Sequence, residues 1–313
     1  MEYSTFEDGN QSPFHRFLVF GDTGTGKTGC LVRSLADLDL EMDSDAVLDG
    51  DVLPVGDAGI FLLATEVNGL QTAKAFNPKL RYRLCDTKRA VQEVLRAAGG
   101  GELAQDGIHT LAIDGGTEIQ RLIKDAQIGD DLSNGSQEKL DYSLYNESTR
   151  KLLRICRNIP LHVVMSALVR TKGNEESDEL ELWPSFEGGK LPGEAAGYFS
   201  AVGYATKTNV GNGVFRHVVH FSDLPPRYKV KAAGRIAKAL KPCAQAWMAI
   251  ADGKMDRRAV RLLVPTAGEI EAQAVAAKAA AAEAKLATVA SAPARPGRPG
   301  RAPSAESKED LNG

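Results

Sequence analysis

Cysteine is scarce in this chain of 313 residues, and its four cysteines lie far apart. No two of them form the C-x-x-C pair of a zinc ribbon, and their spacing does not suggest a disulfide framework. They are Cys30, Cys85, Cys156 and Cys243. This usage is typical of a reducing compartment, so we expect a cytoplasmic protein.

Long apolar runs are absent as well, since no stretch approaches the roughly 18 residues that a membrane-spanning helix requires. The first residues are acidic and polar, which predicts no signal peptide. A net charge of -3 gives no overall basic field that would attract nucleic acid. We therefore expect a soluble protein with no membrane partner, in which any contact with DNA depends on a local patch.

Apolar strand patterns alternate with helical patterns along most of the chain. The predicted strands are Phe17 to Phe20, Gly59 to Thr65, His109 to Asp114 and Leu161 to Ala167. The predicted helices are Lys27 to Leu38, Thr87 to Ala98, Thr117 to Gln127 and Leu140 to Arg157. This alternation predicts an α/β fold whose mostly parallel sheet carries helices on both faces. Asn212-Gly213 lies between two later strand patterns, Ala201 to Thr208 and Val214 to Phe221, and predicts an antiparallel hairpin extension toward the C-terminus.

Composition divides the chain into four parts. Residues 1–13 are expected to be a flexible N-terminus, and residues 14–264 the α/β domain. Residues 265–290 are rich in alanine and include a capping-box match at Thr266 and Glu269, so we predict a helix. Residues 291–313 are rich in Pro, Gly, Ser and charge, which predicts disorder because such a segment buries little apolar surface.

An acidic stretch, Asp37 to Asp57, contains no Lys or Arg. An EF-hand beginning at Asp45 would place Val47 and Gly56 at positions that need oxygen ligands, so a calcium loop does not fit. We expect a solvated surface loop.

A phosphate-binding loop is the strongest motif of the sequence. The segment from Gly21 to Thr28 matches G-x-x-x-x-G-K-[ST] at every fixed position, between a predicted strand and a predicted helix. Its glycines let backbone N–H groups surround phosphates, Lys27 reaches the β- and γ-phosphates, and the Thr28 hydroxyl coordinates Mg²⁺. The predicted nucleotide-binding residues are Gly21, Asp22, Thr23, Gly24, Thr25, Gly26, Lys27 and Thr28. ATP and Mg²⁺ are the expected cofactors, and a chance glycine-rich turn is the alternative.

Two carboxylates follow predicted strands. Asp114 ends an apolar strand and is the candidate for the Mg²⁺ shell. Its alternative role, a helix cap, is less favoured because Thr117 and Gln120 already form a capping-box pattern there. Glu66 follows another strand and could activate the attacking water, or it could be an exposed loop residue.

In their order and spacing, these and later segments resemble the short phage-encoded RecA-like ATPases. That group includes single-strand annealing recombinases and overlaps the phage nucleotide-binding AAA family. The resemblance covers roughly residues 14–250. The segments that carry it are Gly21 to Thr28, Ala64 to Leu70, Leu111 to Asp114, Leu161 to Ala167, Gly188 to Lys190 and Gly193 to Gly203.

The resemblance implies a RecA-like P-loop NTPase core and assigns roles within it. Glu66 would be the catalytic base, and a DNA-binding loop would span roughly Val169 to Pro192. A basic pair that reaches the γ-phosphate of a neighbouring subunit would correspond to Lys229 and Lys231, which would share one face of a strand. A solvated strand face is the alternative for this pair.

The chain departs from the family at two positions: Gly115 stands where Ser is usual, and Ala233 where a second basic residue is common. The candidate DNA loop is also more acidic than basic, which disfavours phosphate contact. Four aromatic residues near it could stack bases or pack in the core; these are Trp183, Phe186, Tyr198 and Phe199. The segment Arg295 to Arg301 partly matches a minor-groove AT-hook arm, or it is simply a solubilising tail.

The resemblance implies a DNA-dependent ATPase that acts on single-stranded DNA in phage recombination or annealing, in the cytoplasm of a bacterial host. Such a protein would self-associate as a ring or filament and could work with a single-stranded DNA-binding protein. Two alternatives stay open: a nucleotide-binding accessory or loader protein of phage replication, and a P-loop small-molecule kinase. The kinase would need an arginine-rich lid, which the sequence does not show.

Overall fold

A computed structural model describes residues 14–33, 59–133, 142–173, 180–211, 214–232, 234–236 and 239–253. The chain separates into two units, Met1–Val264 and Pro265–Gly313, and every described residue lies in the first. The predicted flexible N-terminus, acidic loop, alanine-rich helix and disordered tail lie outside the described residues.

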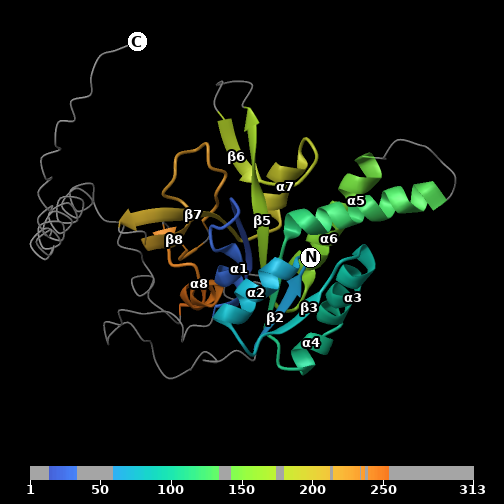
Figure 1. Cartoon of the computed structure of the whole chain (residues 1–313), viewed down its shortest axis with the longest axis horizontal. Coiled ribbons are helices and arrows are strands. Elements are labelled where there is room, and N and C mark those ends of the chain that lie inside the picture. Colours follow the sequence, from blue (N-terminus) through green and yellow to red (C-terminus); the bar gives the residue numbers. More distant parts are fainter. Residues whose placement is uncertain are drawn as a thin grey trace, which may run out of the picture. The chain divides into compact units, whose positions relative to one another are not determined.

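One nine-stranded sheet forms the centre of the first unit (Figure 1). Its order is β3-β2-β4-β5-β1-β7-β8-β9, and β6 pairs with the far end of β5. The strands are β1 (Arg16–Gly21), β2 (Ile60–Ala64), β3 (Arg81–Leu84), β4 (Thr110–Asp114), β5 (His162–Gly173), β6 (Leu180–Pro184), β7 (Ala201–Gly211), β8 (Val214–His220) and β9 (Ala239–Leu240). All pairings from β3 to β7 along this order are parallel, whereas β7, β8 and β9 pair antiparallel. The predicted parallel α/β core with an antiparallel extension is therefore confirmed.

Helices cover both faces of this sheet. They are α1 (Lys27–Val32), α2 (Val67–Phe76), α3 (Lys88–Gly99), α4 (Glu102–Gln105), α5 (Gly116–Ser133), α6 (Tyr142–Asn158), α7 (Leu191–Gly197) and α8 (Ala244–Ala251). One apolar core includes residues of α3, α5, α6 and α7, and a second includes residues of α1, α2 and α8. Thr87 begins α3 as predicted, because its side chain accepts a hydrogen bond of 3.2 Å from the N–H of Ala90.

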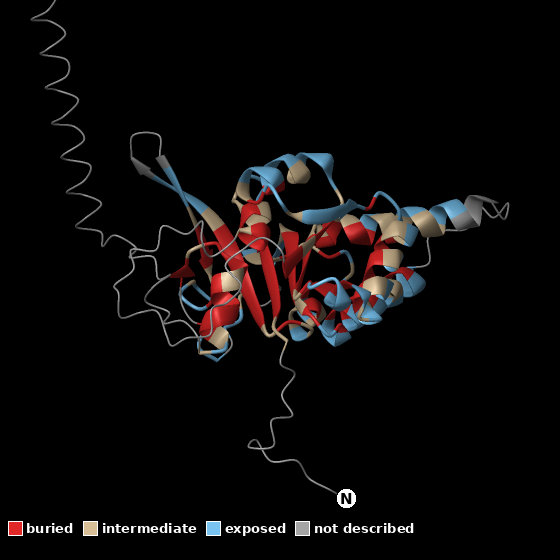
Figure 2. Ribbon diagram, turned by 90° about the horizontal axis from the view of Figure 1, so that it is seen from below, coloured by how far each residue is buried: buried red, intermediate tan, exposed pale blue. Residues whose placement is uncertain are grey.

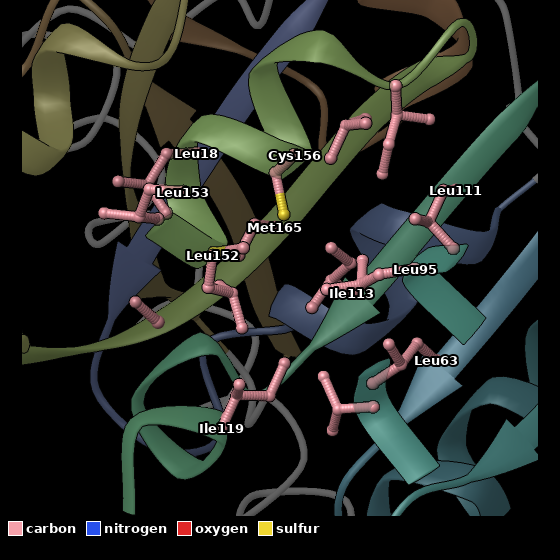
Figure 3. Packing of buried hydrophobic residues seen from close by; sticks show 14 of the residues in the cluster. Leu18, Leu63, Leu95, Leu111, Ile113, Ile119, Leu152, Leu153, Cys156 and Met165 are labelled. Carbon is pink, nitrogen blue, oxygen red and sulfur yellow. The ribbon is translucent and has the colours of Figure 1, made fainter. Parts of the chain in front are cut away.

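Strand β1 shows why the sheet needs helices on both sides. Its alternate residues Leu18 and Phe20 pack in the first core, while Phe17 and Val19 pack in the second. Figure 3 shows part of the first core, to which Leu95 of α3 and Ile113 of β4 both belong. Strand β1 is buried throughout, and β4 is buried up to Ile113, in the red centre of the sheet in Figure 2. Truncating one such fully buried leucine to alanine costs roughly 2–5 kcal/mol of stability.

The structure differs from the predicted elements in ways that packing explains. Strand β5 continues past the predicted end at Ala167 because its far half pairs with β6, from Val169 opposite Pro184 to Gly173 opposite Leu180. Helix α2 and strand β3 were not predicted. Only Ala73 of α2 is buried, and all of β3 is exposed at the sheet edge, so neither carries a strong apolar pattern.

Candidate active site

The phosphate loop lies between β1 and α1, at the carboxyl end of the central parallel strand. Gly24 and Gly26 adopt φ values of 77° and 83°, which L side chains rarely occupy. Position 21 has no space for a side chain, because a Cβ added to Gly21 would lie 2.5 Å from the carbonyl oxygen of Ala205 on β7. The motif therefore has the loop conformation that its sequence predicted.

Lys27 lies at the start of α1 and turns back over the loop. Its ammonium donates hydrogen bonds to the carbonyl oxygens of Gly21, at 2.8 Å, and Asp22, at 2.6 Å. Burial lowers the pKa of Lys27, while the nearby carboxylates of Asp114, Asp22 and Glu66 act in the opposite direction. The cation thus stands over the loop where phosphates are expected to bind.

Asp114 is in contact with the phosphate loop, as its predicted metal role requires. It ends β4, and its Oδ2 accepts a hydrogen bond of 2.7 Å from the Thr28 hydroxyl. Its Oδ1 accepts one of 2.6 Å from the Ser166 hydroxyl of β5. Ser166 was not among the predicted site residues; its only signal in the sequence is a hydroxyl within the apolar run from Leu161 to Ala167.

The backbone conformation and the surroundings of Gly115 leave no room for a side chain. Its φ is 105°, and an added Cβ would clash with the Thr65 hydroxyl. Its N–H donates a hydrogen bond of 2.9 Å to the Ser166 hydroxyl oxygen. Ser166 therefore joins the backbone after β4 to the Asp114 carboxylate, and supplies a hydroxyl that the chain lacks at position 115.

Glu66 follows β2 and immediately precedes α2. Its side chain is exposed and makes no hydrogen bond within the described part of the chain. It lines the same cavity as Lys27, Thr28 and Asp114. The structure brings these four predicted residues together around one space.

That cavity has a volume of about 530 Å³ and opens beside the phosphate loop. The carboxyl ends of parallel strands supply much of its wall. There Ala64 of β2 pairs with Asp114 of β4, and Ile113 of β4 pairs with Met165 of β5, which directly precedes Ser166. His217 of β8 and Arg33, after α1, also line it and were not predicted. The cavity is large enough for a nucleotide-sized ligand.

The chemistry of these groups fits Mg²⁺ that arrives with a nucleotide. The Thr28 hydroxyl and the Asp114 carboxylate are hard oxygen donors in direct contact. Among the described residues, no group of three or more His, Cys, Asp or Glu could hold a metal ion by itself. Phosphate oxygens would therefore complete the shell, as is usual for Mg²⁺ in such sites.

The predicted capping box at the start of α5 is wrong. Thr117 instead accepts a hydrogen bond from the N–H of Leu168 and donates one to the carbonyl of Ser185. The side-chain amide of buried Gln120 accepts a hydrogen bond of 2.6 Å from the N–H of Glu187 and donates one of 3.1 Å to the carbonyl oxygen of Glu187. These hydrogen bonds hold the segment after β6 against α5.

The predicted strand through Lys229 and Lys231 is also wrong, since only isolated bridges form there, at Tyr228 and Lys231. The Lys229 ammonium lies 2.7 Å from a Glu181 carboxylate oxygen and 5.4 Å from the centre of the Trp183 ring. The Lys231 ammonium donates to the carbonyl of Phe199 at 2.8 Å. Neither lysine lines the cavity of its own chain.

The four aromatic residues near the candidate DNA loop divide into two groups. Phe186 and Phe199 are 1% and 2% exposed, so they are core residues and cannot stack bases. Trp183 and Tyr198 are partly exposed. The Trp183 N–H donates to Glu181, and the Arg157 guanidinium lies 5.8 Å from the centre of the Tyr198 ring.

No helix in the described ranges is long and apolar enough to cross a membrane.

A search of curated proteins gave no match. Comparison with protein families matches residues 14–231 to the AAA domain. The matched part contains the phosphate loop, Glu66, Asp114 and Ser166, and it supports nucleotide binding and ATPase activity, for which Mg²⁺ is typical. Because the match covers more than half of the sequence, the chain belongs to the AAA domain family of P-loop ATPases.

Proposed function

We propose that this chain binds Mg-ATP in the cavity beside the phosphate loop and hydrolyses it. The observation that carries the proposal is the contact between the Thr28 hydroxyl and the Asp114 carboxylate, with Glu66 on the wall of the same cavity. A metal-binding hydroxyl, a metal-binding carboxylate and a candidate base therefore surround one site.

Each residue has a distinct role in the proposed reaction. Lys27 neutralises negative charge on the β- and γ-phosphates, and the loop N–H groups orient them. Bound Mg²⁺ supplies further positive charge that stabilises the transferred phosphoryl group. Glu66 accepts a proton from the attacking water, because its exposed carboxylate is not committed to another described group. Ser166 positions Asp114 through their 2.6 Å hydrogen bond.

We propose further that hydrolysis depends on single-stranded DNA and serves phage recombination or annealing. This part rests on the resemblance to phage RecA-like ATPases. The same resemblance supports self-association as a ring or filament, a single-stranded DNA-binding protein as a partner, and the cytoplasm of a bacterial host as the location. Lys229 and Lys231 would act on nucleotide held by a neighbouring subunit.

A second candidate is a nucleotide-binding accessory or loader protein of phage replication, with little turnover. The contacts of Lys229 with Glu181, and of Lys231 with the Phe199 carbonyl, favour it, because both lysines are engaged within their own chain. In that case no neighbouring subunit would receive a basic residue from this pair.

Phosphate release with and without single-stranded DNA separates these candidates. We expect ATP turnover that rises when single-stranded DNA is added, and its loss in Lys27→Ala, which removes the charge over the loop. Turnover that DNA does not change would reject the DNA-dependent part. Tight ATP binding with negligible turnover under both conditions would favour the accessory protein, and full turnover in Lys27→Ala would reject the site itself.

A further inference from the structure

His217 reaches the phosphate loop from a distant part of the sequence. It lies on β8, which pairs with β7, and β7 pairs in turn with β1 beside the loop. Its ring faces the α-carbon of Gly26, since an added Cβ there would lie 2.9 Å from Nδ1 and 3.0 Å from Cγ. The ring also lines the nucleotide cavity.

The Nδ1 atom of His217 is buried and has no hydrogen-bond partner among the described residues. The chain has five histidines, and ring nitrogens of the other four have partners. These partners are Asp252 for His15, Thr110 for His109, the N–H of His15 for His162, and Thr206 and Asp223 for His220. Buried polar atoms are nearly always paired, so an unpaired ring nitrogen on a residue that lines a cavity points to a ligand.

Carboxylates and cations both line the cavity, as Mg²⁺ bound together with an anionic phosphate chain requires; the carboxylates are Glu66, Asp114 and Glu118. Lys27 lines the same cavity, and so does Arg33, whose Nε is a second buried nitrogen without a hydrogen-bond partner among the described residues. The residue opposite His217 on β7 is Lys207, whose ammonium lies 4.1 Å from the centre of the Phe215 ring. An imidazole can carry a proton on Nδ1 and donate it, which suits a phosphate oxygen.

We propose that His217 is a nucleotide-binding residue, whose ring nitrogen donates a hydrogen bond to the phosphate chain held by the loop. This inference rests on the proposed ATP site and adds to it a residue from the antiparallel extension. The β7–β8 hairpin thereby becomes part of the nucleotide site, in addition to its place in the sheet.

Two replacements separate hydrogen bonding from packing. His217→Phe keeps a planar ring against Gly26 and removes both nitrogens, whereas His217→Asn keeps a hydrogen-bonding group close to the position of Nδ1. Arg216→Ala is the matched control, because Arg216 is the neighbouring residue of the same strand and its exposed side chain points to the other face of the hairpin. Isothermal titration would give the affinity of each full-length variant for ADP and for the slowly hydrolysed analogue ATPγS.

We expect His217→Phe to bind both nucleotides about tenfold more weakly, the usual size of a hydrogen bond to a charged group. His217→Asn should keep most of the affinity, and Arg216→Ala should match the unaltered protein. Melting temperatures without nucleotide show that each variant is folded. Unchanged affinity in folded His217→Phe would overturn the inference. Equal losses in Phe and Asn variants would also overturn it, since the hydrogen-bonding group would then be irrelevant.

The control Lys27→Ala keeps this test separate from the proposed function. If the unaltered protein binds nucleotide and Lys27→Ala does not, the ATP site stands whatever His217 does. If the unaltered protein binds no nucleotide, the proposed function fails, and the assignment of His217 fails with it.

Discussion

At the scale of single residues, the two carboxylates of the cavity have different surroundings. Asp114 accepts hydrogen bonds from two hydroxyls, of Thr28 and Ser166, which hold it in one orientation. Glu66 is exposed beside the same cavity. A fixed carboxylate suits a metal shell, and an accessible one suits proton transfer from water.

Glu66→Gln should therefore bind ATP normally but lose turnover by a factor of at least about 100, because the amide keeps the shape and removes the basic oxygen. Asp114→Asn should instead weaken Mg²⁺-dependent nucleotide binding. Nucleotide titrations with and without Mg²⁺, together with steady-state phosphate release, measure both effects. Normal hydrolysis by Glu66→Gln would place the base elsewhere.

At the scale of elements, the junction between β4 and α5 is held in a backbone conformation that only glycine adopts easily. Gly115 has a φ of 105° and leaves no room for a Cβ beside Thr65. The following helix is tied to the segment after β6 by Thr117 and Gln120. Strain at this junction would move Asp114, the last residue of β4.

Gly115→Ala should lower the free energy of unfolding by roughly 1–3 kcal/mol, because it adds backbone strain and a clash. Gly129→Ala, in the same helix, is the matched control: nothing lies within 4 Å of its added Cβ, so helix propensity should raise stability by about 1 kcal/mol. Urea unfolding measures both. Equal stability of the two variants would show that the junction tolerates a side chain.

At the scale of the whole molecule, a histidine cluster lies at the amino ends of the central strands, away from the cavity. The His162 ring stacks on His15 at 5.3 Å between centroids and lies 6.5 Å from His109. Burial, followed by His15, lowers the pKa of His162 from 6.5 to about 4, with smaller effects from His109 and Arg16, while Asp252 acts in the opposite direction. The folded state therefore holds this ring neutral.

This lowered pKa predicts that acid destabilises the fold. Between pH 6.5 and about 4 the unfolded chain binds a proton at His162 that the folded chain does not, so stability falls as pH falls through that range. The loss from this residue between pH 7.5 and pH 5 should be about 2 kcal/mol. His162→Asn, which keeps an acceptor for the N–H of His15, should lose less in urea unfolding at the two pH values. Identical losses in both proteins would contradict the assignment.

Self-association belongs to the same scale. If Lys229 and Lys231 act on a neighbour's nucleotide, the Lys229→Ala/Lys231→Ala double variant should bind ATP but turn over roughly 10³-fold or more slowly. Mixing it with Glu66→Gln should restore part of the phosphate release, because a mixed interface can combine an intact base with intact lysines. Absence of any recovery, with activity per molecule constant on dilution, would confine both lysines to their own chain.

The sequence by itself determined the phosphate loop, the central strands and helix α3. These depend on local chemistry: glycines where φ is positive, apolar alternation and a capping threonine. It also predicted Asp114 and Glu66, because both directly follow apolar strand patterns. An exposed edge strand such as β3 was missed, since it has almost no buried side chains to mark it.

Only the tertiary structure decided which distant residues meet. Ser166 reaches Asp114 through the register of β4 and β5, and His217 reaches Gly26 through β7 and β8. Tertiary packing also buries Phe186 and Phe199 in the core and places the Lys229 ammonium beside the Glu181 carboxylate. Sheet order and register place these side chains, and a pattern of neighbouring residues carries no information about a partner 50 or more positions away.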